Sequence, residues 1–350
     1  MNKKAVIFLI TITSIIFSSL FQLFDAEACT RMFWNTNGKV MLVGRNLDLD
    51  LDDKPVFYVF PRGLSKNGGD DQNPATWISR YGSVVVTHLD TPTFSAEGVN
   101  EAGLAFHSLY LTPTKYESRD YSRPGVNMGR YGIYLLDNAA TVSEALRLIY
   151  QIQLVPEWIH GKVWPQHYAI EDKMGDSAII EFVGGKMNVY HGSEYTVLTN
   201  DPTLDQHILN LWNYQYFGGD LPLPGDLNPM SRFVRASAFL SSLNAAITDQ
   251  EIKPDPVSSM FNAIRAMTEP FGAVQFLPSL GNTPIPAWPT LWTLVYDLTN
   301  KKIYFSHNLA RNNYRIEMQK LNFEKGSPML TMKADKRGLS GEASRYFRSK

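Results

Sequence analysis

Extended segments that follow one another through tight turns constrain the fold of this chain most strongly. Residues 30–45 read as a β-hairpin around the turn sequence Asn35–Gly38, because asparagine and glycine supply the positive φ angles of a tight turn. A second hairpin is predicted at residues 97–111, with Gly103 in its turn, and residues 167–190 read as a meander. Strands joined by short turns pair antiparallel.

Helical patterns stand in groups between these strands and do not alternate with them. Helices are predicted at residues 132–139, 143–150, 204–216, 231–243 and 256–267, and a closing hairpin at 291–306. This order predicts an α+β fold in which two stacked antiparallel sheets are flanked by helices. A doubly wound parallel sheet does not fit, and neither a phosphate loop nor a dinucleotide-binding glycine motif is present.

Residues 1–28 have the composition of a secretory signal peptide. Lys3 and Lys4 precede an apolar run at residues 5–23. Ala26 and Ala28, separated by one residue, form a cleavage signal directly before Cys29. We expect cleavage there, export to the periplasm or the medium, and no stable membrane span after processing.

Two other fates of the leader stay open on sequence grounds. The apolar run approaches the roughly 20 residues of a membrane-spanning helix and could be retained as an anchor. A leader that ends at cysteine could also direct lipid modification, although Ala26 and Glu27 fit that signal poorly.

Cys29 is the single cysteine of the chain, so an intramolecular disulfide is excluded and the thiol is either incidental or reactive. As a first residue, Cys29 would combine a thiol nucleophile with an α-amino base whose ordinary pKa is about 7.7–8.0. With seven histidines and no H-E-x-x-H motif, the sequence gives little support for a zinc site. A formal net charge of -1 gives no indication of nucleic-acid binding.

The rest of the chain is predicted to form one domain at residues 29–323, followed by a polar, mobile tail at 324–350, because no linker divides it. Arg232 and Arg235 fall in the first turn of a predicted helix. Positive charge is disfavoured there, so we expect these arginines to have specific partners.

Five separated segments together resemble the choloylglycine hydrolase family, which includes penicillin V acylases and conjugated bile salt hydrolases. The matching segments are Cys29–Arg31, Gly44–Asp48, Gly98–Leu104, Leu198–Asn200, and Leu223–Asp226 with Ser231–Arg235. The resemblance covers roughly residues 29–320. It implies an N-terminal-nucleophile amidase with a four-layer αββα sandwich and no cofactor.

The resemblance also implies roles for six positions. Cys29 matches the nucleophile, Arg45 and Asp48 its polar partners, Asn200 and the backbone N–H of Tyr110 the oxyanion hole, and Arg232 a further active-site arginine. In the implied mechanism, the amine of Cys29 accepts the thiol proton, the thiolate attacks the amide carbonyl, and water hydrolyses the thioester.

The implied substrate is a small-molecule N-acyl amide with an aryl or fatty acyl group. Tyr110 occupies a position where penicillin V acylases typically carry tyrosine and bile salt hydrolases asparagine, which favours the former. Conjugated bile salts and N-acyl homoserine lactones are the alternatives, and an exported binding module without catalysis is a different class. Candidates for lining the acyl pocket are Trp34, Phe57, Trp77, Tyr81 and Trp288. Homotetramers are expected by family analogy alone.

Overall fold

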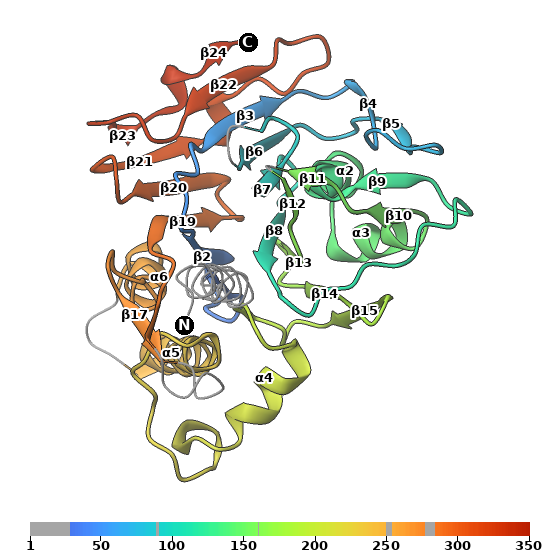
Figure 1. The fold of residues 1–350 in the computed structure, drawn as a ribbon. Helices are drawn as coiled ribbons and strands as arrows, with labels where there is room; N and C mark the ends of the chain where they lie inside the picture. The colour runs from blue at the N-terminus through green and yellow to red at the C-terminus, as the bar shows by residue number, and fades with distance from the viewer. Residues whose placement is uncertain (1–28, 89–90, 160, 250–253, 277–283) are drawn as a thin grey trace, which may run out of the picture.

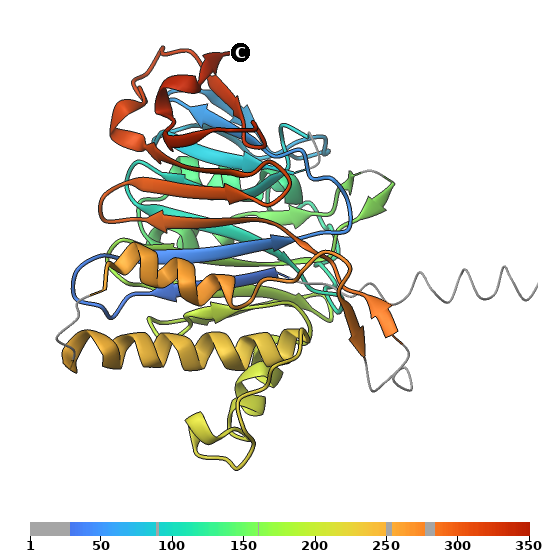
Figure 2. The same ribbon diagram turned by 90° about the vertical axis from the view of Figure 1, so that its left-hand side faces the viewer.

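The computed structural model of the protein describes residues 29–88, 91–159, 161–249, 254–276 and 284–350. The predicted leader at residues 1–28 lies outside the described residues. Two large β-sheets lie face to face, with helices on their outer sides (Figures 1 and 2). None of the helices in the described ranges combines the length and the apolar character that crossing a bilayer requires.

One sheet carries the strand that begins at Cys29. Its seven strands lie in the order β16 (Val197–Leu198), β1 (Cys29–Trp34), β2 (Leu42–Asp48), β19 (Thr290–Asp297), β20 (Lys302–His307), β21 (Asn312–Glu317) and β23 (Ser340–Glu342). The first predicted hairpin is confirmed, since β1 and β2 pair antiparallel with Cys29 opposite Leu47. Asn37 closes its turn by accepting hydrogen bonds from the backbone N–H groups of Lys39 and Val40.

The facing sheet has nine strands, and each neighbouring pair is antiparallel. Their order is β15 (Lys186–His191), β14 (Ser177–Val183), β13 (Gln166–Asp172), β8 (Leu104–Tyr110), β7 (Ser95–Asn100), β6 (Ser83–Thr87), β3 (Val56–Phe60), β22 (Leu330–Lys333) and β24 (Arg348–Ser349). Gly103 turns the chain between β7 and β8 with a φ of +97°, which confirms the second hairpin and places glycine where it is needed.

Helices cover both outer faces, so the predicted fold class is confirmed. The helices are α2 (Tyr131–Asn138), α3 (Val142–Ile149), α4 (Leu204–Leu211), α5 (Pro229–Asp249) and α6 (Pro256–Arg265). Helices α2 and α3 pack on the nine-stranded sheet, α5 and α6 pack on the seven-stranded sheet, and α4 packs against α5. The helix predicted at 204–216 is shorter than expected, because α4 ends at Leu211 and a separate 3-10 turn follows at Gln215–Phe217.

Short ribbons and turns lie outside the two large sheets. Four two-stranded ribbons pair β4 (Ser65–Asn67) with β5 (Thr76–Ile78), β9 (Gly125–Asn127) with β10 (Gln153–Val155), β11 (Trp158–Ile159) with β12 (Lys162–Val163), and β17 (Val274–Phe276) with β18 (Pro284–Pro286). Further 3-10 turns lie at Met128–Arg130, Met318–Lys320 and Ser344–Tyr346.

Local signals explain where two of the helices, α3 and α6, begin. Thr141 caps α3 by accepting a hydrogen bond from the backbone N–H of Glu144 at 3.2 Å. The carboxylate of Glu144 in turn accepts from the N–H of Ala140, one residue before the position that a capping box predicts. Asp255 caps α6 in the same way and is followed by Pro256 at the first helical position.

The expectation of a mobile C-terminal tail is wrong. Strand β22 pairs with β3 and strand β23 pairs with β21, so residues 324–350 extend both sheets. The side chains of Ala334 and Phe347 are buried, and the side-chain amide of Asn312 donates to the Ala334 carbonyl at 2.8 Å. Polar composition was misleading here, because short strands at a sheet edge expose much of their surface and need few apolar residues.

Candidate active site

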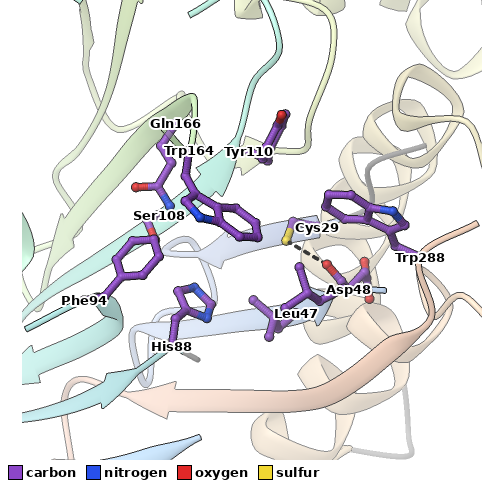
Figure 3. Close-up of a pocket in the computed structure, with 11 residues that line it drawn as sticks. Cys29, Leu47, Asp48, His88, Phe94, Ser108, Tyr110, Trp164, Gln166 and Trp288 are labelled. Atoms are coloured by element: carbon purple, nitrogen blue, oxygen red, sulfur yellow. Dashed lines mark hydrogen bonds between the residues drawn. The ribbon is translucent and has the colours of Figure 1, made fainter. Parts of the chain in front are cut away.

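Cys29 is the first residue of β1 and is almost completely buried, with 5% of its surface exposed. Its sulfur lies 3.9 Å from the backbone carbonyl oxygen of Asp48, at the end of the neighbouring strand β2 (Figure 3). The hairpin therefore places the thiol on a rigid sheet, beside the residues that end the second strand.

Arg45, also on β2, is fully buried beside the thiol. Its Nε donates to the Glu97 carboxylate at 2.6 Å, and its Nη2 donates to the Ser108 carbonyl at 2.8 Å. These bonds fix the guanidinium from the facing sheet. Burial raises the pKa of the Cys29 thiol, and the positive charge of Arg45 is the largest influence that opposes this rise.

Asp48 ends β2 with a buried carboxyl group, and neither of its oxygens makes a hydrogen bond of ordinary geometry within the described chain. Burial raises the pKa of this carboxyl to about 7, although Arg232, the nearby Thr290 hydroxyl and Arg45 act in the opposite direction. Buried polar groups are usually paired, so Asp48 is positioned to accept a further donor.

Asn200 and Arg232 bind the main chain of Cys29. The N–H of Cys29 donates to the side-chain oxygen of Asn200, and the side-chain nitrogen of Asn200 donates to the Tyr110 carbonyl at 2.9 Å. Arg232 donates through Nη1 to the Cys29 carbonyl at 2.6 Å and to the Thr30 hydroxyl at 2.8 Å. Its Nη2 lies 3.2 Å from the same Asn200 oxygen.

The two arginines at the start of α5 do have specific partners, as predicted. Glu269, which the sequence interpretation missed, lies 3.1 Å from the Nε of Arg232, and both side chains are fully buried. Arg235 donates to the backbone carbonyls of Pro224 and Asp226 at 3.1 and 2.6 Å. For Arg232, the fourth residue of α5, these contacts offset the unfavourable position of positive charge near a helix N-terminus. Arg235 lies in the second turn and not in the first as predicted, because α5 begins at Pro229.

Glu269 gives this cluster a second buried acid near Asp48. Burial raises the pKa of Glu269 to about 8, Arg232 lowers it, and the charge of Asp48 raises it further. Arg232 therefore acts on both buried carboxyl groups, with Arg45 also acting on Asp48 and Arg235 on Glu269. Glu269 lacks any motif in the sequence, and its approach to Arg232 depends on the tertiary fold.

Tyr110 ends β8, on the facing sheet, and its ring lies edge-on to Trp164 and Trp288 at centroid distances of 6.3 and 5.8 Å. All six predicted site residues thus lie around one point, where the ends of β1, β2 and β8 meet the start of α5. Their catalytic roles remain predictions.

A narrow, mostly apolar cavity opens beside the thiol (Figure 3). Its free volume is about 30 Å³, which is room for about two water molecules. It is lined by Cys29, Leu47, Asp48, Leu49, His88, Phe94, Ser108, Tyr110, Trp164, Gln166 and Trp288. Of the five aromatic residues proposed from sequence, Trp288 lines this cavity. Phe94 and Trp164 were missed, because nothing in their local sequence separates a lining ring from a core ring.

Among the residues that the structure describes, no three histidine, cysteine, aspartate or glutamate side chains gather closely enough to hold a metal ion. The acidic side chains around Cys29 face arginines instead.

Comparison with known proteins agrees with this geometry. A family model described as linear amide C–N hydrolases, choloylglycine hydrolase family, matches residues 29–331. A penicillin V acylase of Pectobacterium atrosepticum is 31% identical over 315 residues, which cover 85% of this chain and 82% of that protein. A bile salt hydrolase/transferase of Clostridium perfringens is 28% identical over 237 residues, covering 61% and 71% of the two chains.

Solved structures show the same fold. A penicillin V acylase from Agrobacterium tumefaciens has a TM-score of 0.78 at 32% identity, covering 92% of this chain and 98% of that one. A conjugated bile acid hydrolase from Clostridium perfringens has a TM-score of 0.73 at 22% identity, covering 88% and 98%, and supports the fold alone. This chain is therefore an amidohydrolase that belongs to the choloylglycine hydrolase family of linear amide C–N hydrolases.

Proposed function

We propose that this protein is an exported amidase of the penicillin V acylase kind, activated when removal of its leader makes Cys29 the first residue. The proposal rests on the position of Cys29 beside a cavity and on the hydrogen bonds to its main chain. Its thiol faces a cavity, while hydrogen bonds to Asn200 and Arg232 hold its main-chain nitrogen and carbonyl. The family match also begins at residue 29.

Cleavage would turn the peptide nitrogen of Cys29 into an amine that can act as the general base. With an ordinary pKa of about 7.7–8.0, this amine accepts the thiol proton, and the thiolate attacks the substrate carbonyl carbon. The ammonium then gives its proton to the leaving nitrogen. Asp48, whose oxygens make no hydrogen bond of ordinary geometry within the described chain, would accept a charge-assisted bond from the ammonium.

Asn200 and Tyr110 would stabilise the negative oxygen of the tetrahedral intermediate. One N–H of the Asn200 amide is directed to the Tyr110 carbonyl, and an amide nitrogen carries a second hydrogen that can donate to the substrate oxygen. The backbone N–H of Tyr110 is the second proposed donor. Water then hydrolyses the thioester with the amine of Cys29 as base, which regenerates the thiol.

The aromatic lining of the cavity favours an acyl group that carries an aryl ring. Trp164, Trp288, Phe94 and Tyr110 present aromatic surface beside the thiol, and aromatic rings pack well against a flat aryl group. The named relatives that are more than 30% identical to this chain are penicillin V acylases.

A parallel hydrolysis panel tests this proposal. The mature chain from Cys29 is incubated with penicillin V, glycine- and taurine-conjugated bile salts, and acyl homoserine lactones of several lengths. We expect the highest kcat/KM with penicillin V. Cys29→Ala should abolish hydrolysis and Cys29→Ser should remove most of it, with melting temperatures close to that of the parent. Near-normal turnover by Cys29→Ala would rule out the thiol mechanism.

A further inference from the structure

Five fully buried charged side chains connect the interior of the sandwich to the thiol. In order they are Arg31, Glu171, His107, Glu97 and Arg45, which we call the buried charge chain. Arg31 and His107 both bond to the Glu171 carboxylate, and the other ring nitrogen of His107 bonds to Glu97. Glu97 then accepts from Arg45 at 2.6 Å. Each neighbour has the opposite charge.

Strand register explains why these residues meet. Arg31 and Arg45 stand directly opposite each other on β1 and β2, where two like charges are destabilising. Glu97 and His107 stand opposite each other on β7 and β8, in the facing sheet, and Glu171 lies on the adjacent strand β13. Each arginine thus receives a carboxylate from across the sandwich, which is what burial of a charge requires.

The contacts favour the imidazolium form of His107. Both ring nitrogens face carboxylates, which accept hydrogen bonds and do not donate them when ionised. Burial lowers the pKa of His107, but the charges of Glu171 and Glu97 outweigh that and raise it to about 9. The ring of Tyr296 on β19 also packs on His107 at 5.8 Å, and its pKa lies well above the usual range, so that phenol stays neutral.

The buried charge chain therefore contains three cations and two anions, and it ends at the guanidinium beside Cys29. We propose that His107 and Glu97 are positioning residues for the nucleophile. They fix Arg45 against Cys29 and leave one net positive charge that favours the thiolate. This inference rests on the proposed function, in which a thiolate of Cys29 attacks the substrate. Neither residue contacts the substrate in this account.

Alkylation of Cys29 by iodoacetamide measures the thiolate directly. His107→Gln removes the central positive charge, and we expect alkylation at pH 7 to be about tenfold slower, equivalent to roughly one unit in the thiol pKa. His107→Lys keeps the charge and should retain most of the rate. The kcat for amide hydrolysis should fall in parallel with alkylation, with KM unchanged. Equal rates in the parent and His107→Gln would overturn the proposal, and so would equal losses in both variants.

A matched control is Lys66→Gln, which removes the cation of another largely buried ion pair, with Asp137 at 2.9 Å. Lys66 is not among the residues lining the Cys29 cavity, so its alkylation rate should equal that of the parent.

If the His107 variants fail to fold, ¹⁵N-histidine NMR of the parent protein provides the test. At least one histidine should keep both ring nitrogens protonated at pH 8, above the ordinary histidine pKa of about 6.5. A spectrum in which no histidine keeps both ring nitrogens protonated at pH 8 would contradict the proposal. Alkylation and NMR need no substrate, so failure of the hydrolysis panel with these results intact would count against the proposed function alone.

Discussion

At the scale of single residues, the chemistry depends on opposing effects of burial and charge at Cys29. Burial raises the pKa of the thiol, and Arg45 is the strongest opposing influence. Asp48 and Glu269 also have raised pKa values of about 7 and 8, because burial disfavours their charged forms and the neighbouring Arg232 offsets this only in part. Such perturbed groups around a cavity are typical of functional sites.

Asn200 is the residue whose substitution tests the oxyanion hole most directly. Asn200→Ala removes the proposed side-chain donor, and loss of one such donor typically lowers kcat by about 10²–10³. We expect a loss in this range in steady-state assays with the best substrate of the panel, with KM little changed. Because Asn200 also bonds to the Cys29 nitrogen, the melting temperature must be compared as a control. An unchanged kcat in a folded variant would exclude the assigned role.

Sequence alone could predict part of this site. Arg45 and Asp48 lie on the returning strand of the predicted hairpin, which makes proximity to Cys29 plausible, but their roles came from the family resemblance. Asn200, Arg232 and Tyr110 came from the family resemblance, since no local pattern shows that they approach the thiol. The ion pairs Arg31–Glu171 and Arg45–Glu97 could not be predicted, because each joins the two sheets and depends on how they stack.

At the scale of elements, the site depends on close packing of α6 against β2. Gly44 precedes Arg45, and a Cβ atom there would lie 2.7 Å from the sulfur of Met260 and 3.0 Å from the Cβ of Ile264. A glycine at this point lets the helix approach the strand that carries Arg45 and Asp48.

Gly44→Val should therefore destabilise the protein and disturb the site. We expect a loss of about 1–3 kcal/mol in the free energy of unfolding, the usual cost of overpacking a core, measured by urea denaturation. Gly225→Ala is the matched control, because a Cβ there meets nothing within 4 Å. Equal stabilities for the two variants would show that α6 can move away from β2 without cost.

Element prediction worked where the turn chemistry was strong and failed at the sheet edges. The hairpins at Gly38 and Gly103 were predicted from their turn residues, and both glycines have positive φ angles. Strands β22, β23 and β24 have only two to four residues each. Segments this short carry too little alternation to be recognised. Their stability comes from pairing, of β22 with β3, of β23 with β21 and of β24 with β22.

At the scale of the whole molecule, each layer supplies a different part of the site. The seven-stranded sheet provides Cys29, Arg45 and Asp48, the nine-stranded sheet provides Tyr110, and helix α5 provides Arg232. The proposed catalytic arrangement therefore requires both sheets in their observed stacking. The order of strands and helices predicted that two sheets stack, but not which residues of the two sheets face each other.

The central claim is that removal of the leader creates the active site, and the N-terminus of the exported protein tests it most directly. The full chain is expressed in a bacterium that can export it, and the product is examined by intact mass and N-terminal sequencing alongside the hydrolysis assay. Ala28→Phe, which places a large residue at the cleavage site, is the matched control and should yield an uncut, inactive chain. We predict an active protein that begins at an unmodified Cys29. An active protein that keeps residues before Cys29, or one whose Cys29 amine is acylated, would contradict the account.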